Sequence, residues 1–114
     1  MKPADFRRIA LGLPGTEEKS HFGVADFRVG GRIYAELGWP DAGFGSLKLT
    51  RDQQEMLMDA EPGMFERAPG AFGQKGATLV QLAVVDAPTL KSALTMAWRN
   101  RAPRKLAATV PEAR

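Results

Sequence analysis

The sequence contains no cysteine, a single histidine and no long hydrophobic run. The absence of cysteine excludes disulfide bonds, zinc–thiolate sites, iron–sulfur clusters and a cysteine nucleophile. No stretch approaches the run of about 18 apolar residues that a membrane-spanning helix needs. No apolar segment follows Lys2, so we expect no signal peptide. These absences predict a cytoplasmic protein with no membrane role.

Catalytic and metal-binding patterns are also missing. His21 could bind a metal only with Glu17 and Glu18, two adjacent side chains that do not readily converge on one ion. Neither Ser20 nor any other serine lies in the GxSxG pattern of a nucleophile elbow. We therefore expect His21 to bond to backbone in a structural role, and we expect no enzyme activity, no metal and no cofactor. The glycine-rich stretch 70–76 lacks the Gly-Lys-Ser/Thr ending of a P-loop and indicates a flexible loop.

The length and composition are those of one folded domain. The chain has 114 residues, 44% of them hydrophobic and 25% charged, which argues against disorder. We assign residues 1–105 to a single domain and expect residues 106–114 to form a frayed tail. Lysine and arginine number 16 against 13 acidic residues, a net charge of +3 that permits a polyanionic partner without requiring one.

Three helices are predicted from apolar spacing and capping residues. The first begins at Pro3, buries residues at helical spacing and ends before Pro14. The second begins after Thr50, where Gln53 completes a capping box, and ends at Pro62-Gly63. The third begins after Asp86 and ends at Pro103. The apolar stripes of the first and third helices comprise Phe6, Ile9, Ala10, Leu13, Leu90, Ala93, Leu94, Ala97 and Trp98.

A β-hairpin is predicted around Gly30-Gly31, where the apolar period changes to two. A two-residue loop would mix the two faces of the hairpin. A three-residue loop ending at Arg32, or an equivalent bulge, places six apolar residues on one face. The resulting pairs are Val29 with Ile33, Phe27 with Ala35 and Ala25 with Leu37.

This register also determines where the charged side chains of the hairpin lie. Arg32 projects into solvent at the hairpin tip, and Asp26 faces Glu36 across the strands. Like charges directly opposite are unfavourable, so Arg28 or a neighbour must offset this pair.

Further strands are predicted at 46–49, 64–67 and 78–85, with Leu47 and Leu49 inward and Ser46 and Lys48 outward. The element order is helix, three strands, helix, two strands, helix. Short turns imply antiparallel pairing, and the terminal helices would cover one face of the sheet. The predicted fold is an α+β two-layer sandwich with helices on one face of an antiparallel sheet.

Basic residues are the strongest functional signal. Arg28 and Lys48 are expected on the outer sheet face beside an exposed Tyr34, which could stack on a base. Cations at these positions can neutralise phosphates. For the C-terminal group, the alternative is a solvated helix end that complements the helix macrodipole. The candidate nucleic-acid-binding residues are Arg28, Arg32, Lys48, Lys75, Arg99, Arg101, Arg104 and Lys105.

Several motifs together resemble the MmcQ/YjbR family over residues 1–105. They are Leu13-Pro14-Gly15-Thr16-Glu17-Glu18, His21-Phe22-Gly23, the run from Phe27 to Ala35, Leu47-Lys48-Leu49 and Ala102-Pro103-Arg104-Lys105. The resemblance implies a CyaY-like fold and DNA binding through projecting β loops described as a double wing. It also implies that Phe22, Phe27, Ile33 and Leu47 pack in the interior. Family members often have an aromatic residue where this chain has Ala77.

Iron binding on the related frataxin-type fold uses an acidic ridge on the first helix. Here Arg7 and Arg8 outweigh Asp5, so we expect no iron site. Our first hypothesis is a monomeric, non-catalytic DNA-binding protein that contacts phosphates through the basic hairpin and loop residues. The alternative is a small protein-interaction or adaptor module with no nucleic-acid role, whose protein partner the sequence does not identify.

Overall fold

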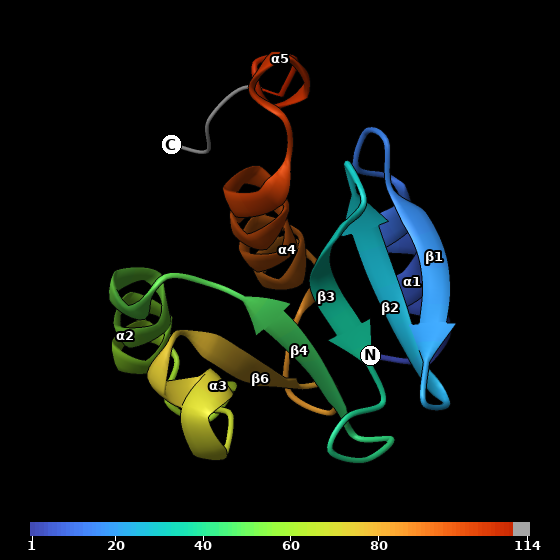
Figure 1. The fold of residues 1–114 in the computed structure, drawn as a ribbon. Coiled ribbons are helices and arrows are strands. Elements are labelled where there is room, and N and C mark those ends of the chain that lie inside the picture. The colour runs from blue at the N-terminus through green and yellow to red at the C-terminus, as the bar shows by residue number, and fades with distance from the viewer. Residues whose placement is uncertain (111–114) are drawn as a thin grey trace.

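A computed structural model of the chain describes residues 1–110. Within them, six strands form one antiparallel sheet in the spatial order β1-β2-β3-β4-β6-β5 (Figure 1). The strands are β1 (Glu17–His21), β2 (Val24–Val29), β3 (Arg32–Leu37), β4 (Phe44–Lys48), β5 (Phe65–Arg67) and β6 (Ala77–Gln81). The helices are α1 (Pro3–Leu11), α2 (Arg51–Ala60), α3 (Gly70–Gln74), α4 (Ala87–Arg101) and α5 (Arg104–Ala107).

The core lies between the sheet and the two longer terminal helices. α1 and α4 pack on the same face of the sheet and contact each other (Figure 1). Trp98 of α4 is fully buried, and its indole N–H donates to the Pro14 carbonyl at 2.9 Å. The predicted two-layer α+β sandwich is confirmed. Its core includes Phe6, Ala10, Phe27, Val29, Leu47, Leu90, Ala93, Leu94, Ala97 and Trp98.

The predicted helix starts are also confirmed. The Thr50 hydroxyl accepts from the Gln53 N–H at 3.1 Å, and the Gln53 side chain accepts from the Thr50 N–H. The Asp86 carboxylate accepts from the Thr89 N–H at 2.9 Å. These bonds satisfy N–H groups that lack partners in the first turn of a helix. No helix within residues 1–110 is long and apolar enough to cross a membrane.

The hairpin of β2 and β3 adopts the bulge that was the predicted alternative to a three-residue loop, and its pairing differs from the prediction at the tip. The turn is Gly30-Gly31 alone, both residues with positive φ, so Val29 pairs with Arg32 rather than with Ile33. A bulge in β3 takes up the extra residue. Beyond the bulge the predicted pairs are present, Phe27 with Ala35 and Ala25 with Leu37.

The bulge turns Tyr34 into the core and Ile33 onto the opposite face of the sheet. The Tyr34 side chain is fully buried, its hydroxyl donates to the Ala10 carbonyl at 3.1 Å, and it lies 3.0 Å from the Thr16 hydroxyl. Burial raises the pKa of Tyr34 to about 12, although the Thr16 contact opposes this. The prediction of an exposed Tyr34 that stacks on a base is therefore wrong.

The edge strand β1 was not expected, because Glu17–His21 contains no apolar residue and so lacks a two-residue period. Backbone pairing with β2 along its whole length maintains it as a strand. The Glu18 carboxylate also accepts from Arg7 of α1 at 2.8 Å. Charged side chains are typical of an exposed edge strand.

The stretch 70–76, expected to be a flexible loop, contains α3 and packs tightly. A Cβ on Gly73 would overlap the Ala68 carbonyl, so only glycine fits there. Gln54 of α2 is fully buried and donates to the carbonyls of Gly73 at 3.1 Å and Ala77 at 2.9 Å. These contacts place α3 at a defined position beside β6.

The end of the last strand and the start of the C-terminal tail also differ from the prediction. β6 ends at Gln81 rather than continuing through the predicted 78–85, and Val84, in the turn that follows, is 51% exposed. In the predicted tail 106–114, Leu106 and Val110 pack against the core. The rest of that tail, 111–114, lies outside the described residues.

Candidate functional site

The sheet face opposite α1 and α4 carries a row of polar side chains. Directly opposite residues of an antiparallel pair share a face. Asp26 pairs with Glu36, and Glu36 pairs with Ser46. Ser46 in turn pairs with the apolar Leu79, so the polar row crosses β2, β3 and β4 and ends beside β6. Two adjoining clefts lie over this part of the sheet.

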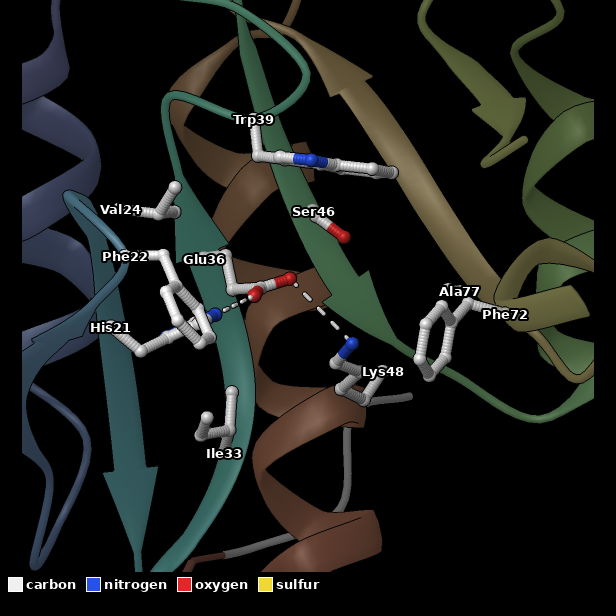
Figure 2. Close-up of a pocket in the computed structure, with 10 residues that line it drawn as sticks. All are labelled: His21, Phe22, Val24, Ile33, Glu36, Trp39, Ser46, Lys48, Phe72 and Ala77. Atoms are coloured by element: carbon white, nitrogen blue, oxygen red, sulfur yellow. Dashed lines mark ion pairs between the residues drawn. The ribbon is translucent and has the colours of Figure 1, made fainter. Parts of the chain in front are cut away.

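The first, which we call the aromatic cleft, has a volume of about 440 Å³. Figure 2 shows three aromatic side chains around it and the polar heads of Glu36, Ser46 and Lys48 between them. This volume falls in the range of small-molecule sites. The lining residues are His21, Phe22, Val24, Ile33, Glu36, Trp39, Ser46, Lys48, Phe72 and Ala77.

The aromatic side chains come from three separate connections. Phe22 occupies the β1–β2 turn, Trp39 the β3–β4 connection and Phe72 the helix α3. Phe22 is fully exposed and Phe72 is 69% exposed. Phe22 also has a φ of 50°, a left-handed conformation that bulky residues rarely adopt. The expectation that Phe22 packs in the interior is wrong, and Ile33 likewise lines the cleft instead of the core.

His21 joins the two facing carboxylates. Its Nδ1 lies 2.7 Å from Asp26 Oδ2, and its Nε2 lies 2.9 Å from Glu36 Oε2. A protonated imidazole donates to both carboxylates, whereas a neutral one donates to only one. His21 therefore bridges the two carboxylates. The predicted backbone bond of His21 is replaced by these two side-chain contacts.

Two further cations complete the network. Arg28 donates to Asp26 through Nε at 2.7 Å and Nη2 at 3.1 Å, and Lys48 Nζ lies 3.5 Å from Glu36 Oε1. The Arg28 guanidinium, followed by His21, holds the pKa of the fully buried Asp26 carboxyl below its usual range, although burial opposes them. The prediction that Arg28 or a neighbour offsets the Asp26–Glu36 pair is confirmed.

Ser46 is the exception in this row. It is 1% exposed, and its hydroxyl is a buried side-chain polar atom without a hydrogen-bond partner within residues 1–110. Leaving a buried hydroxyl unpaired is unfavourable by roughly 1–3 kcal/mol. Figure 2 shows this hydroxyl on the side of Ser46 that faces the aromatic cleft. It is therefore placed to bond to a ligand.

The second cleft, which we call the basic cleft, lies where β3 and β4 diverge. The two strands pair only from Ala35 to Leu37 on β3, and they separate toward Arg32 and Lys48 (Figure 1). The cleft has a volume of about 510 Å³. Its lining residues are Arg28, Gly31, Arg32, Ile33, Lys48, Leu49, Phe72, Lys75, Ala77 and Arg101.

The structure brings together five of the eight predicted nucleic-acid-binding residues in this cleft: Arg28, Arg32, Lys48, Lys75 and Arg101. Arg99 instead donates to the carbonyls of Ala107 at 3.1 Å and Val110 at 2.9 Å. Arg104 and Lys105 are exposed on α5 and line neither cleft.

The five cations differ in their availability. Arg28 and Lys48 are paired with Asp26 and Glu36. Within residues 1–110, Arg32, Lys75 and Arg101 form no ion pair. These three side chains are therefore the cations of the cleft that can bind an anion without first breaking an internal pair.

Metal binding is not supported by the side-chain arrangement. No group of three or more histidine, aspartate or glutamate side chains in the described part of the chain is placed to hold an ion. Asp26 and Glu36 are occupied by His21, Arg28 and Lys48.

Comparisons with known proteins agree with this architecture. The model of the protein family described as YjbR matches residues 11–100. Among solved structures, the crystal structure of a Deinococcus radiodurans protein with the domain DUF419 superposes with a TM-score of 0.73 and 24% sequence identity. The match covers 87% of this chain and 77% of that one, and it shows a shared fold. No curated protein matches the chain.

Proposed function

The chain belongs to the YjbR family, and from this premise we propose that it binds DNA through phosphate contacts in the basic cleft, without catalysing a reaction. The observation that carries the proposal is the convergence of five predicted basic residues on one cleft, from positions far apart in the sequence. They come from the β2–β3 hairpin, the end of β4, the segment after α3 and the end of α4.

The free cations are the ones that contact phosphates. Arg32 at the start of β3 and Lys75 after α3 lie at opposite sides of the cleft, and Arg101 lines it from α4. Phosphate oxygens are the same in every nucleotide, so these contacts position a strand without reading its sequence. Asp26 and Glu36 retain Arg28 and Lys48 through ion pairs, which limits the number of phosphates held at once. We therefore expect the affinity for DNA to be modest and to fall as the salt concentration rises.

A titration of fluorescently labelled DNA tests the proposal. Wild-type protein is added to a labelled duplex and to a labelled single strand of the same length at two salt concentrations, and anisotropy is recorded. We expect binding that weakens as salt rises, because bound cations release counterions from the DNA. Arg32→Ala combined with Lys75→Ala should weaken binding on the order of tenfold.

The matched control removes the same charge from the helical side of the molecule. Arg8→Ala combined with Lys91→Ala deletes two basic side chains that line a separate depression with Ile9 and Gly12. This control should bind DNA like the wild type. Equal losses in the two double variants would mean that net charge rather than the basic cleft determines binding.

The adaptor alternative requires a concentrated apolar surface. The exposed large apolar side chains Leu11, Met56 and Val84 lie on α1, α2 and the turn after β6, and they do not line the clefts. Within residues 1–110, the exposed large apolar side chains that line one cleft together are Phe22 and Phe72, and that cleft adjoins the basic cleft. This distribution supports the nucleic-acid proposal over a protein-docking role.

A further inference from the structure

We infer that the aromatic cleft receives an unpaired base of a single DNA strand whose phosphates occupy the neighbouring basic cleft. This inference rests on the proposed function and specifies the form of the nucleic acid. It follows from three features: the aromatic rim, the unpartnered Ser46 hydroxyl and the continuity of the two clefts.

The rim of the cleft suits a flat ring. Trp39 and Phe72 lie on different sides of the space, and Phe22 borders its mouth (Figure 2). Aromatic side chains stack on bases of any sequence, because each base has a π face. Phe22 and Phe72 are largely exposed, so their rings already face solvent. Lys48 Nζ lies over the Phe72 ring, 5.3 Å from its centroid, so a base stacks on the other face of that ring or displaces the ammonium.

The floor of the cleft suits the polar edge of a base. The Ser46 hydroxyl has no internal partner and can donate or accept one hydrogen bond. Glu36, 13% exposed, and Lys48, 22% exposed, lie beside it with an acceptor and a donor. A base edge carries both donors and acceptors, whereas a purely apolar ligand would leave the Ser46 hydroxyl buried and unpaired.

The two clefts are continuous, so one ligand can place a ring in the aromatic cleft and a phosphate in the basic cleft. They share Ile33, Lys48, Phe72 and Ala77. A ligand that fills both has an aromatic part and an anionic part, the composition of a nucleotide. In a duplex the bases are paired and stacked inside, so only an unpaired nucleotide can enter without an unstacking cost of a few kcal/mol.

Ala77 controls the space between the two clefts. It lines both, and its small side chain leaves them open to each other. Val24 lines the aromatic cleft and not the basic cleft, so a large side chain at position 24 would fill the first cleft and leave the cations of the second in place. Val24→Trp therefore separates base binding from phosphate binding.

The experiment compares a single strand of normal nucleotides with an abasic strand of the same length and charge, by competition against a labelled strand. Both strands carry the phosphates, and only one carries bases. We expect wild-type protein to bind the normal strand roughly 10- to 100-fold more tightly, the range given by stacking of one or two bases. A mononucleotide should compete far more weakly than the strand, because it makes few of the phosphate contacts.

Two variants and a control complete the test. Val24→Trp should abolish the preference for the normal strand while retaining salt-sensitive binding of the abasic strand. Ser46→Ala should reduce that preference several-fold without changing abasic-strand binding. Ala83→Trp adds the same indole at an exposed position in the turn after β6, outside both clefts, and should behave as wild type. Thermal unfolding verifies that each variant folds.

The outcomes separate this inference from the proposed function. Equal, salt-sensitive binding of normal and abasic strands overturns the base-binding inference and leaves the phosphate proposal intact. An unaltered preference in folded Val24→Trp protein also overturns it. A mononucleotide that competes as well as the strand identifies a free nucleotide as the ligand and contradicts the strand assignment. No binding of any strand at low salt contradicts both proposals.

Discussion

At the scale of single residues, Asp26 organises the outer face of the sheet. It is fully buried and accepts hydrogen bonds from Arg28 on its own strand and from His21 on the neighbouring strand. His21 also contacts the Glu36 carboxylate, and Glu36 forms an ion pair with Lys48. A buried carboxylate in this position is stable only while its cations remain, because an unpaired buried charge is strongly unfavourable.

Replacing this carboxylate should weaken the fold in a pH-dependent way. We expect Asp26→Asn to lower the free energy of unfolding at about pH 7 by on the order of 2 kcal/mol, because Arg28 and His21 lose their charged acceptor. The pKa of Asp26 is lowered from 3.8, so its contribution is complete above that value and is lost as the pH falls below it. The difference between variant and wild type should therefore shrink in acid.

Urea unfolding at about pH 7 and about pH 3 measures this effect. Asp59→Asn, an exposed carboxylate on α2, is the control and should change stability little at either pH. A difference between Asp26→Asn and wild type that persists unchanged in acid would contradict the assigned ion pairs.

Tyr34 provides a second titration, because it is the single tyrosine of the chain. Burial raises its pKa to about 12 from an ordinary value of 10.0, so the folded state holds the phenol proton more tightly than the unfolded state. Stability contributed by Tyr34 is complete below pH 10 and is lost between about pH 10 and pH 12, by on the order of 2 kcal/mol.

Ultraviolet absorbance of the phenolate measures this titration, with Tyr34→Phe as the blank. We expect no phenolate in folded protein at pH 10, where a solvent-exposed tyrosine is half ionised. Half ionisation at pH 10 in protein that is still folded would show that the phenol is not buried beneath α1.

At the scale of secondary-structure elements, the turn between β1 and β2 holds Phe22 in an unfavourable backbone conformation with its ring exposed to solvent. Phe22 is followed by Gly23, and both have positive φ, the conformation that Asn-Gly adopts most readily in two-residue hairpin turns. A bulky residue in this conformation is disfavoured by about 1–3 kcal/mol. Because the ring is fully exposed, its removal leaves no cavity in the core.

Phe22→Asn should therefore stabilise the protein by about 1 kcal/mol and weaken its preference for a normal strand over an abasic strand. Thermal unfolding and the competition assay measure the two effects. Phe22→Ala, which removes the ring without the turn preference of asparagine, should weaken base binding with little gain in stability. If Phe22→Asn is less stable than wild type, the assigned turn conformation is wrong.

The elements also show how far the sequence predicts this structure. The stripes of α1 and α4, the Thr50 and Asp86 caps and most hairpin pairs follow from local spacing, since burial on one face imposes a period. β1 has no such signal, because Glu17–His21 is stabilised by pairing with β2. The bulge turns Tyr34 to the inner face of the sheet and Ile33 to the outer face. It reconciles a two-residue Gly30-Gly31 turn with the pairing that keeps Phe27, Ala35 and their apolar neighbours on one face.

The same distinction applies to the candidate site. The basic residues are visible in the sequence, but their convergence depends on where β3 and β4 diverge and where α3 packs, which are tertiary features. The unpaired Ser46 hydroxyl and the bridging of two carboxylates by His21 arise from cross-strand neighbours. Outward-facing Ser46, the Asp26–Glu36 juxtaposition and the offsetting Arg28 were predictable from the sequence, whereas the bridging by His21 was not.

At the scale of the whole molecule, charge is distributed unevenly over a chain of net charge +3. One sheet face is closed by α1 and α4, and the other holds both clefts. Internal ion pairs neutralise the centre of this open face, and free cations remain where β3 and β4 separate. The molecule therefore presents an edge with unpaired cations beside an aromatic cleft, without a uniformly positive surface.

The salt dependence of binding to a single strand tests this account most directly. Each phosphate contact contributes about 0.7 to the slope of log K against log salt for single strands, so removal of Arg32, Lys75 and Arg101 should reduce the magnitude of the slope by about 2. The Arg8→Ala/Lys91→Ala control should retain the wild-type slope. An identical slope in the triple variant Arg32→Ala/Lys75→Ala/Arg101→Ala and the wild type would show that these cations do not contact phosphates, and would contradict the central claim.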